Sequence, residues 1–170
     1  INRQNVQVLI SLITSLGFDE NTAEIIGYSA IDWADDDDNL SHEEFGAELE
    51  YYEAEQGYKP KNLHFDSIYE LHYVRGMTEE IFQRLKWYVT VYPQDNNLKV
   101  NFDTASEVVL KAVALSKSGS ATNTEDSDAE SLVRKMIEYR RGSDGQSFTA
   151  DDRSIELGQM GLNAKERVLF

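Results

Sequence analysis

The sequence predicts a mainly α fold: a multi-helix domain with one or more helical hairpins and a small two-stranded element. Three observations lead to this prediction. Apolar residues recur at three- and four-residue spacing in several segments, residue pairs typical of helix starts precede those segments, and only two short stretches are rich in Val and Tyr. With 170 residues and 41% hydrophobic content, the chain suits one helical domain spanning residues 1–170.

The first quarter of the chain predicts two helices. Apolar residues at positions 6, 9, 10, 13 and 16 mark an amphipathic helix, and Gly17 stands where a C-cap glycine belongs. Asn21 with Glu24 forms a capping-box pattern for a second helix, which reaches Trp33 and leads into a run of aspartates.

The next segment predicts a short helix over residues 43–56, a loop around Gly57 and Pro60, and then a helical hairpin over residues 66–89. In this hairpin Ser67 pairs with Glu70 as a cap, Gly76 makes the turn, and Thr78 starts the second helix. Residues 154–170 echo the hairpin sequence; the match is short, and chance explains it almost as well as a second hairpin does.

The remaining segments complete the prediction. Residues 88–93 and 98–102 have strand character around the turn-like residues 94–97. Thr104 with Glu107 predicts a helix through about Leu115, and residues 129–142 predict another. Between them, residues 116–127 are small, polar and without periodicity, so we expect a mobile loop. Thr149 with Asp152 marks the start of a last helix.

Charge and composition exclude several functions. The chain has 31 acidic and 16 basic residues, a formal charge of −15, which disfavours binding to a phosphate backbone. It has no cysteine, which excludes disulfides, thiolate ligands and cysteine nucleophiles. No apolar run reaches the roughly 18 residues that a membrane-spanning helix requires.

The aspartate run is the strongest candidate for a binding site. Asp35, Asp37 and Asn39 alternate as in calcium-binding loops, and Glu48 follows Asp37 by eleven residues, the spacing of the closing glutamate of an EF-hand. His42 replaces the mid-loop glycine, so the stretch is not an EF-hand. By spacing alone, a solvated acidic loop explains the run equally well.

Other chemistry has weaker support. The three histidines, at positions 42, 64 and 72, fit no compact zinc motif, and the chain has no phosphate loop or nucleophile elbow. An acid hydrolase built on the aspartate run would need carboxylates facing each other across a cleft. We therefore expect no enzymatic activity.

The hairpin suggests an alternative function, nucleic-acid binding, because it has the form of a helix-hairpin-helix nucleic-acid module with Arg75 in its turn. Glu79 and Glu80 follow at once, which favours a hairpin used for packing.

Taken in order, several motifs resemble the minor pseudopilin K family of bacterial type II secretion systems. These are D-W-x-D-x-D at residues 32–37, G-A-E-x-x-Y-Y at 46–52, Y-x-P-x-N at 58–62, F-x-S-x-x-E-L at 65–71, G-M-T at 76–78, Y-V-T-V-Y at 88–92, and N-x-x-T-A-S at 101–106. The resemblance covers about residues 5–110. One departure is Asp103, which stands where the family has a second asparagine.

The resemblance implies a noncatalytic component of the pseudopilus tip that aids protein export across the outer membrane and binds calcium (Ca2+). The family-matching acids Asp32, Asp35, Asp37 and Glu48 are the implied ligands, and Asp36 and Asp38 are additional acids in the run. The implied partners are the minor pseudopilins I and J, with a secreted substrate or the outer-membrane secretin as further candidates.

The same resemblance implies a location. We expect residues 1–170 to be excised from a longer, membrane-anchored pseudopilin, as its periplasmic part in the envelope of a Gram-negative bacterium. The helix-hairpin-helix nucleic-acid module remains the alternative.

Overall fold

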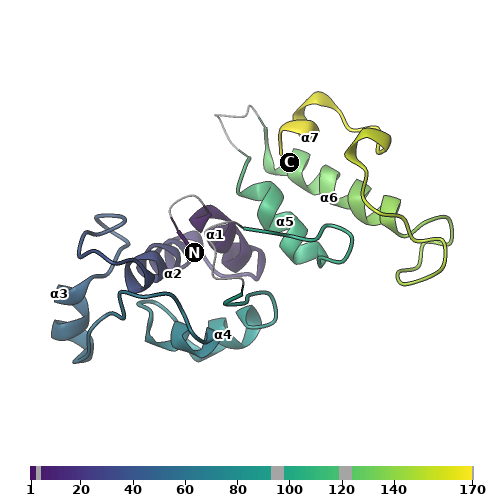
Figure 1. The fold of residues 1–170 in the computed structure, drawn as a ribbon. Coiled ribbons are helices and arrows are strands. Elements are labelled where there is room, and N and C mark those ends of the chain that lie inside the picture. Colours follow the sequence, from purple (N-terminus) through teal and green to yellow (C-terminus); the bar gives the residue numbers. More distant parts are fainter. Residues whose placement is uncertain (3–4, 93–97, 119–123, 170) are drawn as a thin grey trace. The chain divides into compact units, whose positions relative to one another are not determined.

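The computed structural model describes residues 1–2, 5–92, 98–118 and 124–169. Within these ranges the chain is mainly helical, as predicted (Figure 1). The elements in order are α1 (Val6–Ser15), α2 (Glu20–Ala34), α3 (Leu49–Tyr51), the π-helical turn η1 (Tyr52–Gln56), the 3-10 helix η2 (Ile68–Tyr73), α4 (Glu79–Leu85), α5 (Glu107–Leu115), α6 (Asp126–Arg140), the 3-10 helix η3 (Leu157–Gln159) and α7 (Ala164–Val168).

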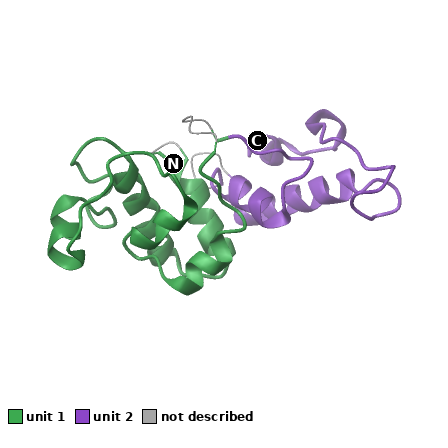
Figure 2. Ribbon diagram, turned by 60° about the horizontal axis from the view of Figure 1, so that its bottom comes forward, with its two compact units in different colours: residues 1–98 green, residues 99–170 purple. Residues whose placement is uncertain are grey.

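These elements form two compact units, residues 1–98 (unit 1) and residues 99–170 (unit 2), coloured separately in Figure 2. The domain expected over residues 1–170 thus comprises two units, and each is described by itself. None of the helices in the described ranges has the length and apolar character needed to cross a bilayer.

In unit 1, α1 packs against α2 and α4. The apolar spacing that predicted α1 places Ile10 and Ile13 in the core, where Ile26 of α2 is also fully buried. From α4, Phe82 and Leu85 are buried as well. The amphipathic pattern therefore identified the buried faces of these helices.

Some helix starts were predicted within one to two residues, but the helix expected over residues 43–56 begins only at Leu49 and continues as the π-helical turn η1, and the helix expected over residues 129–142 begins earlier, at Asp126. Asp19, rather than Asn21, caps α2 by accepting a hydrogen bond from the Thr22 N–H at 2.9 Å. Ser106, rather than Thr104, caps α5. Polar residues crowd both helix starts, and a side chain acts as the cap only if its own backbone is extended just before the first turn.

The predicted hairpin is present in unit 1, although its first arm is the 3-10 helix η2. Ser67 and Glu70 form the expected capping box, Gly76 has φ +83°, and Thr78 caps α4. The Gly76 turn packs closely against α2, since a Cβ at this position would be 2.8 Å from Cγ2 of Ile25.

Unit 2 ends in the same order of elements. The 3-10 helix η3 is followed by Gly161 at φ +63° and by Asn163, whose capping box opens α7. The sequence echo at residues 154–170 therefore coincides with a second 3-10 helix, glycine turn and capped helix.

The predicted two-stranded element is wrong for the residues that the structure describes. Neither residues 88–92 nor residues 98–102 form a strand, and among the described residues only Thr124 forms an isolated bridge. Residues 93–97, which hold the expected turn, lie outside the described residues. A two-stranded pair is marginal in water, so high β propensity alone does not stabilise it.

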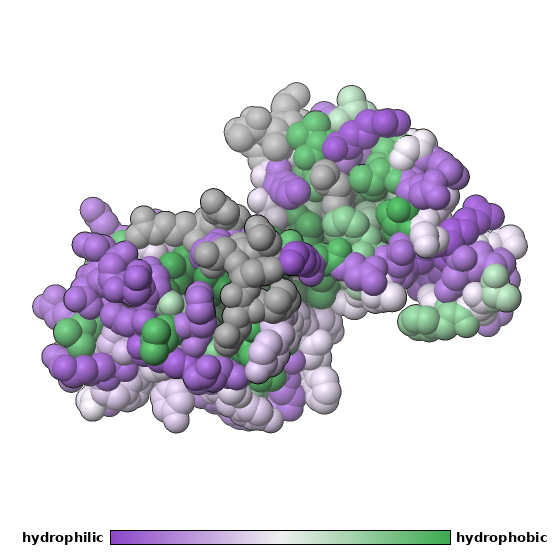
Figure 3. All heavy atoms as spheres, in the orientation of Figure 1, coloured by the Kyte–Doolittle hydropathy of each residue, from purple (hydrophilic) through white to green (hydrophobic). Residues whose placement is uncertain are grey.

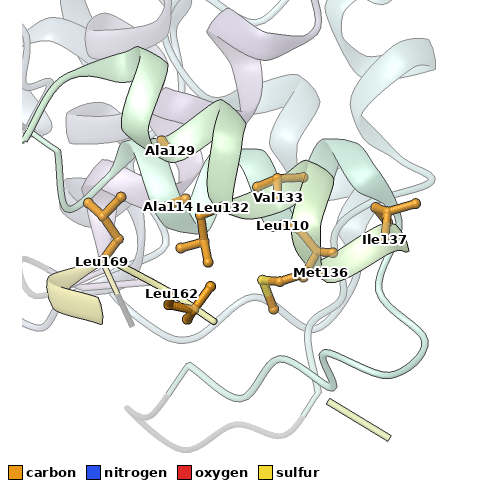
Figure 4. Close-up of a cluster of buried hydrophobic side chains, with 9 residues drawn as sticks. All are labelled: Leu110, Ala114, Ala129, Leu132, Val133, Met136, Ile137, Leu162 and Leu169. Carbon is orange, nitrogen blue, oxygen red and sulfur yellow. The ribbon is translucent and has the colours of Figure 1, made fainter. Parts of the chain in front are cut away.

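The core of unit 2 joins α5, α6 and the C-terminal segment (Figure 4). Leu110 of α5, Leu132 and Met136 of α6, and Leu169 after α7 are all fully buried. Thr149 and Asp152 start no helix and instead contact each other in a turn. Of the predicted mobile loop 116–127, residues 119–123 lie outside the described residues, and residues 126–127 already belong to α6.

Candidate functional site

The aspartate run begins where α2 ends, and Asp32 anchors it. Asp32 lies in the last turn of α2 and is fully buried. One of its carboxylate oxygens accepts the Ser41 N–H at 2.8 Å, and the other accepts the Ala47 N–H at 2.7 Å. The loop over residues 35–48, here called the acidic loop, is thus tied back to its own helix by one carboxylate.

Gly46 makes this approach possible. A Cβ at Gly46 would lie 2.4 Å from Oδ2 of Asp32 and 2.8 Å from the His42 carbonyl oxygen. Both distances are far below van der Waals contact, so only glycine leaves room for the carboxylate. The glycine of the G-A-E-x-x-Y-Y motif therefore has a steric role in seating Asp32.

Glu48 closes the acidic loop and is the most unusual group in it. Its backbone is extended at the N-cap of α3, and the residue is only 6% exposed. Neither of its carboxylate oxygens has a hydrogen-bond partner among the described residues. Burial without a partner disfavours an ionised carboxylate.

Burial and the negative charges of nearby aspartates both affect the pKa of the Glu48 carboxyl group. Burial is the largest cause that raises the pKa of Glu48, to about 8, and the negative charges of Asp32, Asp35, Asp38 and Asp37 raise it further. The acids that were singled out from the sequence therefore all act electrostatically on one buried carboxylate.

The predicted ligands differ in their surroundings. Asp35 is the half-buried C-cap of α2, whereas Asp36, Asp37 and Asp38 are exposed. Oδ1 of Asp37 accepts hydrogen bonds from both nitrogens of Asn39, at 2.8 and 2.7 Å. No three His, Asp or Glu side chains in the described parts of the chain are grouped closely enough to hold a metal ion as they stand.

Asn62 and Arg75 lie outside the acidic loop and contact it, and the sequence reasoning did not assign them to the site. Asn62 places its Nδ2 3.3 Å from Oδ1 of Asp38 and 3.4 Å from the Asp37 carbonyl oxygen. Arg75 donates to the carbonyl oxygens of Gly46 at 2.9 Å and Glu44 at 3.4 Å. Asn62 belongs to the Y-x-P-x-N motif, and this motif position was the one sequence signal that could have assigned it to the site.

Aromatic rings pack beside the end of α2. Trp33 is nearly buried and packs edge-on against Tyr52 and Tyr58, at ring distances of 5.4 and 6.1 Å, and stacks on Tyr73 at 5.9 Å. Arg75 lies over the ring of Tyr51 at 5.0 Å. These contacts connect the end of α2 and the α3 segment to the hairpin, because Tyr73 ends η2 and Arg75 is in the hairpin turn.

Two of the three histidines pack against aromatic rings. The ring of His42 stacks on Phe45 at 4.6 Å, and the ring of His72 packs on Phe82 at 3.9 Å, with its Nε2 3.0 Å from a Glu79 oxygen.

Acidic residues are concentrated in unit 1. Residues 1–98 hold 19 of the 31 acidic residues and 6 of the 16 basic ones, so unit 1 carries −13 of the formal −15. In Figure 3 hydrophilic residues cover much of the visible face of this unit. A surface of this charge attracts cations and repels polyanions.

Three comparisons relate the chain to known proteins. A family model described as type II secretion system (T2SS), protein K, matches residues 1–94. A protein of Escherichia coli strain K12, named putative type II secretion system protein K, is 30% identical over 132 residues, which are 76% of this chain and 38% of the relative.

A solved structure of the GspK-GspI-GspJ complex from the enterotoxigenic Escherichia coli type 2 secretion system matches 96% of this chain and 52% of the matched chain. Its TM-score is 0.65 at 23% identity, a likeness of fold. The chain thus spans about two fifths to one half of the length of these relatives. Because the family model covers more than half of the 170 residues, the chain belongs to the type II secretion system protein K family.

Proposed function

We propose that this chain is the helical part of a noncatalytic minor pseudopilin at the tip of a type II secretion pseudopilus, where it aids protein export across the outer membrane. Membership of the protein K family supports the assignment to this system. The matched structure contains GspI and GspJ, which supports the minor pseudopilins I and J as partners. The chain would then lie in the periplasm, as part of an inner-membrane-anchored protein of a Gram-negative bacterium.

Calcium stabilisation is the second part of the proposal, and the surroundings of Glu48 are the observation that carries it. A buried carboxylate with no hydrogen-bond partner among the described residues is costly unless a cation pairs with it. The oxygen donors around it are of the hard type that calcium prefers. We infer that Asp35, Asp37 and Glu48 would hold the ion, with Asp36 and Asp38 as further acids of the loop.

Asp32 has a different position in this proposed site. Both of its oxygens already accept backbone N–H groups, so it would reach a cation only with its remaining lone pairs. Bound calcium would neutralise the repulsion between the acids and join the end of α2 to the start of α3. The exposed aspartates would have to close on Glu48, because the acids are not grouped at ligand distance in the described structure.

Thermal unfolding tests the calcium proposal. Both tryptophans, Trp33 and Trp87, lie in unit 1, so their fluorescence reports on the unit that holds the acidic loop. Calcium at about 100 times its Kd should stabilise unit 1 by about 2.7 kcal/mol, which raises the Tm by roughly 10–20 °C. Glu48→Gln should lose most of this increase. Exposed Glu50→Gln is the matched control and should keep it. An equal Tm of the wild-type chain in calcium and in chelator would refute the calcium proposal.

The partner proposal has its own test. The chain should co-elute with the soluble parts of pseudopilins I and J of the same system in size-exclusion chromatography, whereas a major pseudopilin should not be retained. If neither I nor J binds at micromolar concentration, the assignment to the tip is wrong for this part of the protein.

No observation favours the nucleic-acid alternative. The hairpin turn would have to offer its backbone and Arg75 to a phosphate group. Gly76 instead lies close against Ile25 of α2, and Arg75 is held by carbonyl oxygens of the acidic loop. A strongly acidic unit adds repulsion. Binding of duplex DNA at low salt would restore the alternative.

A further inference from the structure

The segment that follows α4, residues 87–92 and here called the aromatic segment, combines strand-forming residues with an unpaired backbone. Its last four residues belong to no helix, strand or turn. The Tyr92 N–H donates to the side-chain oxygen of Thr90 at 3.2 Å. The backbone N–H and C=O groups of Val89, Thr90 and Val91 have no hydrogen-bond partner within the described ranges. A row of unpaired backbone groups can pair with another strand.

The side chains of the aromatic segment alternate in burial as those of a strand do. Val89 and Val91 are half-buried, whereas Thr90 and Tyr92 are exposed. Successive residues of a strand point to opposite faces, so this pattern fits a strand that covers the protein with one face and meets solvent with the other. The segment therefore has the side-chain pattern of a strand before it has a strand partner.

Two exposed aromatic side chains flank the unpaired backbone groups. Trp87 is 78% exposed and Tyr92 is 69% exposed. Nζ of Lys86 lies 5.0 Å from the centroid of the Trp87 ring. Tryptophan and tyrosine are the residues that most often anchor protein–protein interfaces. The aromatic side chains thus indicate a protein partner, and the backbone between them indicates that this partner contributes a strand.

The charge of unit 1 narrows the kind of partner further. Unit 1 has a formal charge of −13, so a second copy of the chain would be repelled, whereas a basic surface would be attracted. Lysine is common on the open edges of β-sheets, where it keeps those edges from pairing with each other. An open, basic sheet edge therefore complements the aromatic segment in both backbone and charge.

We propose that the aromatic segment binds a partner protein by strand addition, as an extra strand on an open sheet edge that carries lysine or arginine. The backbone from Val89 to Val91 would form the hydrogen bonds, and Trp87 and Tyr92 would anchor the two ends. The inference rests on the proposed function, because pseudopilins I and J are the candidate sources of this edge. It gives unit 1 a protein-binding surface outside the acidic loop.

Proline substitution tests the backbone contacts, because proline has no N–H. Neighbouring residues of a strand direct their N–H groups to opposite edges, so either Thr90 or Val91 should donate to the partner. The probes are the soluble parts of pseudopilins I and J, each titrated into the chain and followed by calorimetry. Thr90→Pro or Val91→Pro should weaken binding by about tenfold or more. Thr90→Ala and Val91→Ala keep the N–H, and each should bind within about threefold of the wild-type chain.

Amide hydrogen exchange distinguishes strand addition from docking by side chains alone. In the complex, an amide of residues 89–91 that faces the partner should exchange more slowly than in the free chain. Trp87→Ala should weaken binding by about tenfold or more. Leu63→Ala removes another exposed apolar side chain of unit 1 and is the control, with unchanged affinity. Because the partner edge is basic, binding should weaken as the salt concentration rises.

The outcomes separate this inference from the proposed function. Proline variants that both bind as tightly as their alanine counterparts, or amides that stay unprotected in the complex, overturn strand addition and leave the assignment to the tip in place. If the wild-type chain binds neither I nor J at micromolar concentration, that assignment fails and strand addition fails with it. Dimers of the chain that protect the same amides would make a second copy the partner and overturn the basic edge. If a proline variant has a lower Tm than its alanine counterpart, hydrogen exchange in the wild-type complex decides.

Discussion

Replacing Glu48 by glutamine should have opposite effects on stability with and without calcium. In chelator, the raised pKa of Glu48 means that the native state holds this proton more tightly than the unfolded chain does. Between about pH 4.5 and pH 8 the unfolded chain releases the proton first, so native stability falls as the pH rises through this window. Glutamine is neutral at every pH and removes this dependence.

The size of the effect follows from the difference between the ordinary pKa of 4.5 and the value of about 8 in the folded chain. At about 1.36 kcal/mol per pH unit, this difference corresponds to a loss of roughly 5 kcal/mol across the window, of which roughly 3 kcal/mol is reached by pH 7. Glu48→Gln should therefore be more stable than the wild-type chain in chelator at pH 8.5. With saturating calcium the order should reverse, since only the wild-type chain offers a carboxylate to the ion.

Urea unfolding followed by tryptophan fluorescence measures both effects, at pH 5, 7 and 8.5, with chelator and with calcium. The difference between wild-type and variant curves isolates the contribution of Glu48 from those of all other titrating groups. Glu50→Gln, which changes an exposed glutamate nearby, should follow the wild-type curve. Parallel pH curves for the wild-type chain and Glu48→Gln, or a variant that is less stable in chelator at pH 8.5, would refute the reasoning.

Three further substitutions test the packing. Gly46→Ala places a Cβ 2.4 Å from Oδ2 of Asp32, so it should destabilise unit 1 by about 1–3 kcal/mol. Urea unfolding followed by tryptophan fluorescence measures this loss, and an unchanged unfolding midpoint would contradict the steric role of Gly46. Glu166→Gln weakens the 2.8 Å ion pair of a fully buried carboxylate with Lys135, and circular dichroism should record a loss of about 1.5–3 kcal/mol at pH 7. Burial raises the pKa of Glu166, but hydrogen bonds, first that from Lys135, outweigh burial and lower the pKa. The stability that the ion pair provides should therefore disappear as the pH falls below about 4.5. A loss of stability in Glu166→Gln that is equal at pH 3 and pH 7 would exclude the ion pair as its cause. Leu132→Ala opens a cavity in the core of unit 2 and should cost about 2–5 kcal/mol by the same measurement, whereas a cost below 1 kcal/mol would mean that the site collapses around the smaller residue.

Local sequence signals predicted the helices well, because a helix forms from contacts between residues three and four apart. The buried positions Ile10 and Ile13 of α1 follow from that spacing, and so does the Ser67 capping box, which needs only residues within one turn. The strand prediction for residues 88–92 was wrong in the described structure because a strand needs a partner, and propensity does not provide one.

For the candidate site, the sequence by itself determined which residues bear oxygen donors and that they form an ordered motif with Glu48. Only the tertiary structure decided their separate environments: Asp32 bonds to two backbone amides, Glu48 is buried without a hydrogen-bond partner among the described residues, and Asn62 reaches the loop from 24 residues beyond Asp38. Burial and long-range contacts depend on how helices and loops pack in space. The spacing of residues along the chain therefore identifies the acids of the site. Packing decides which acid is buried and which residue from outside the loop contacts them.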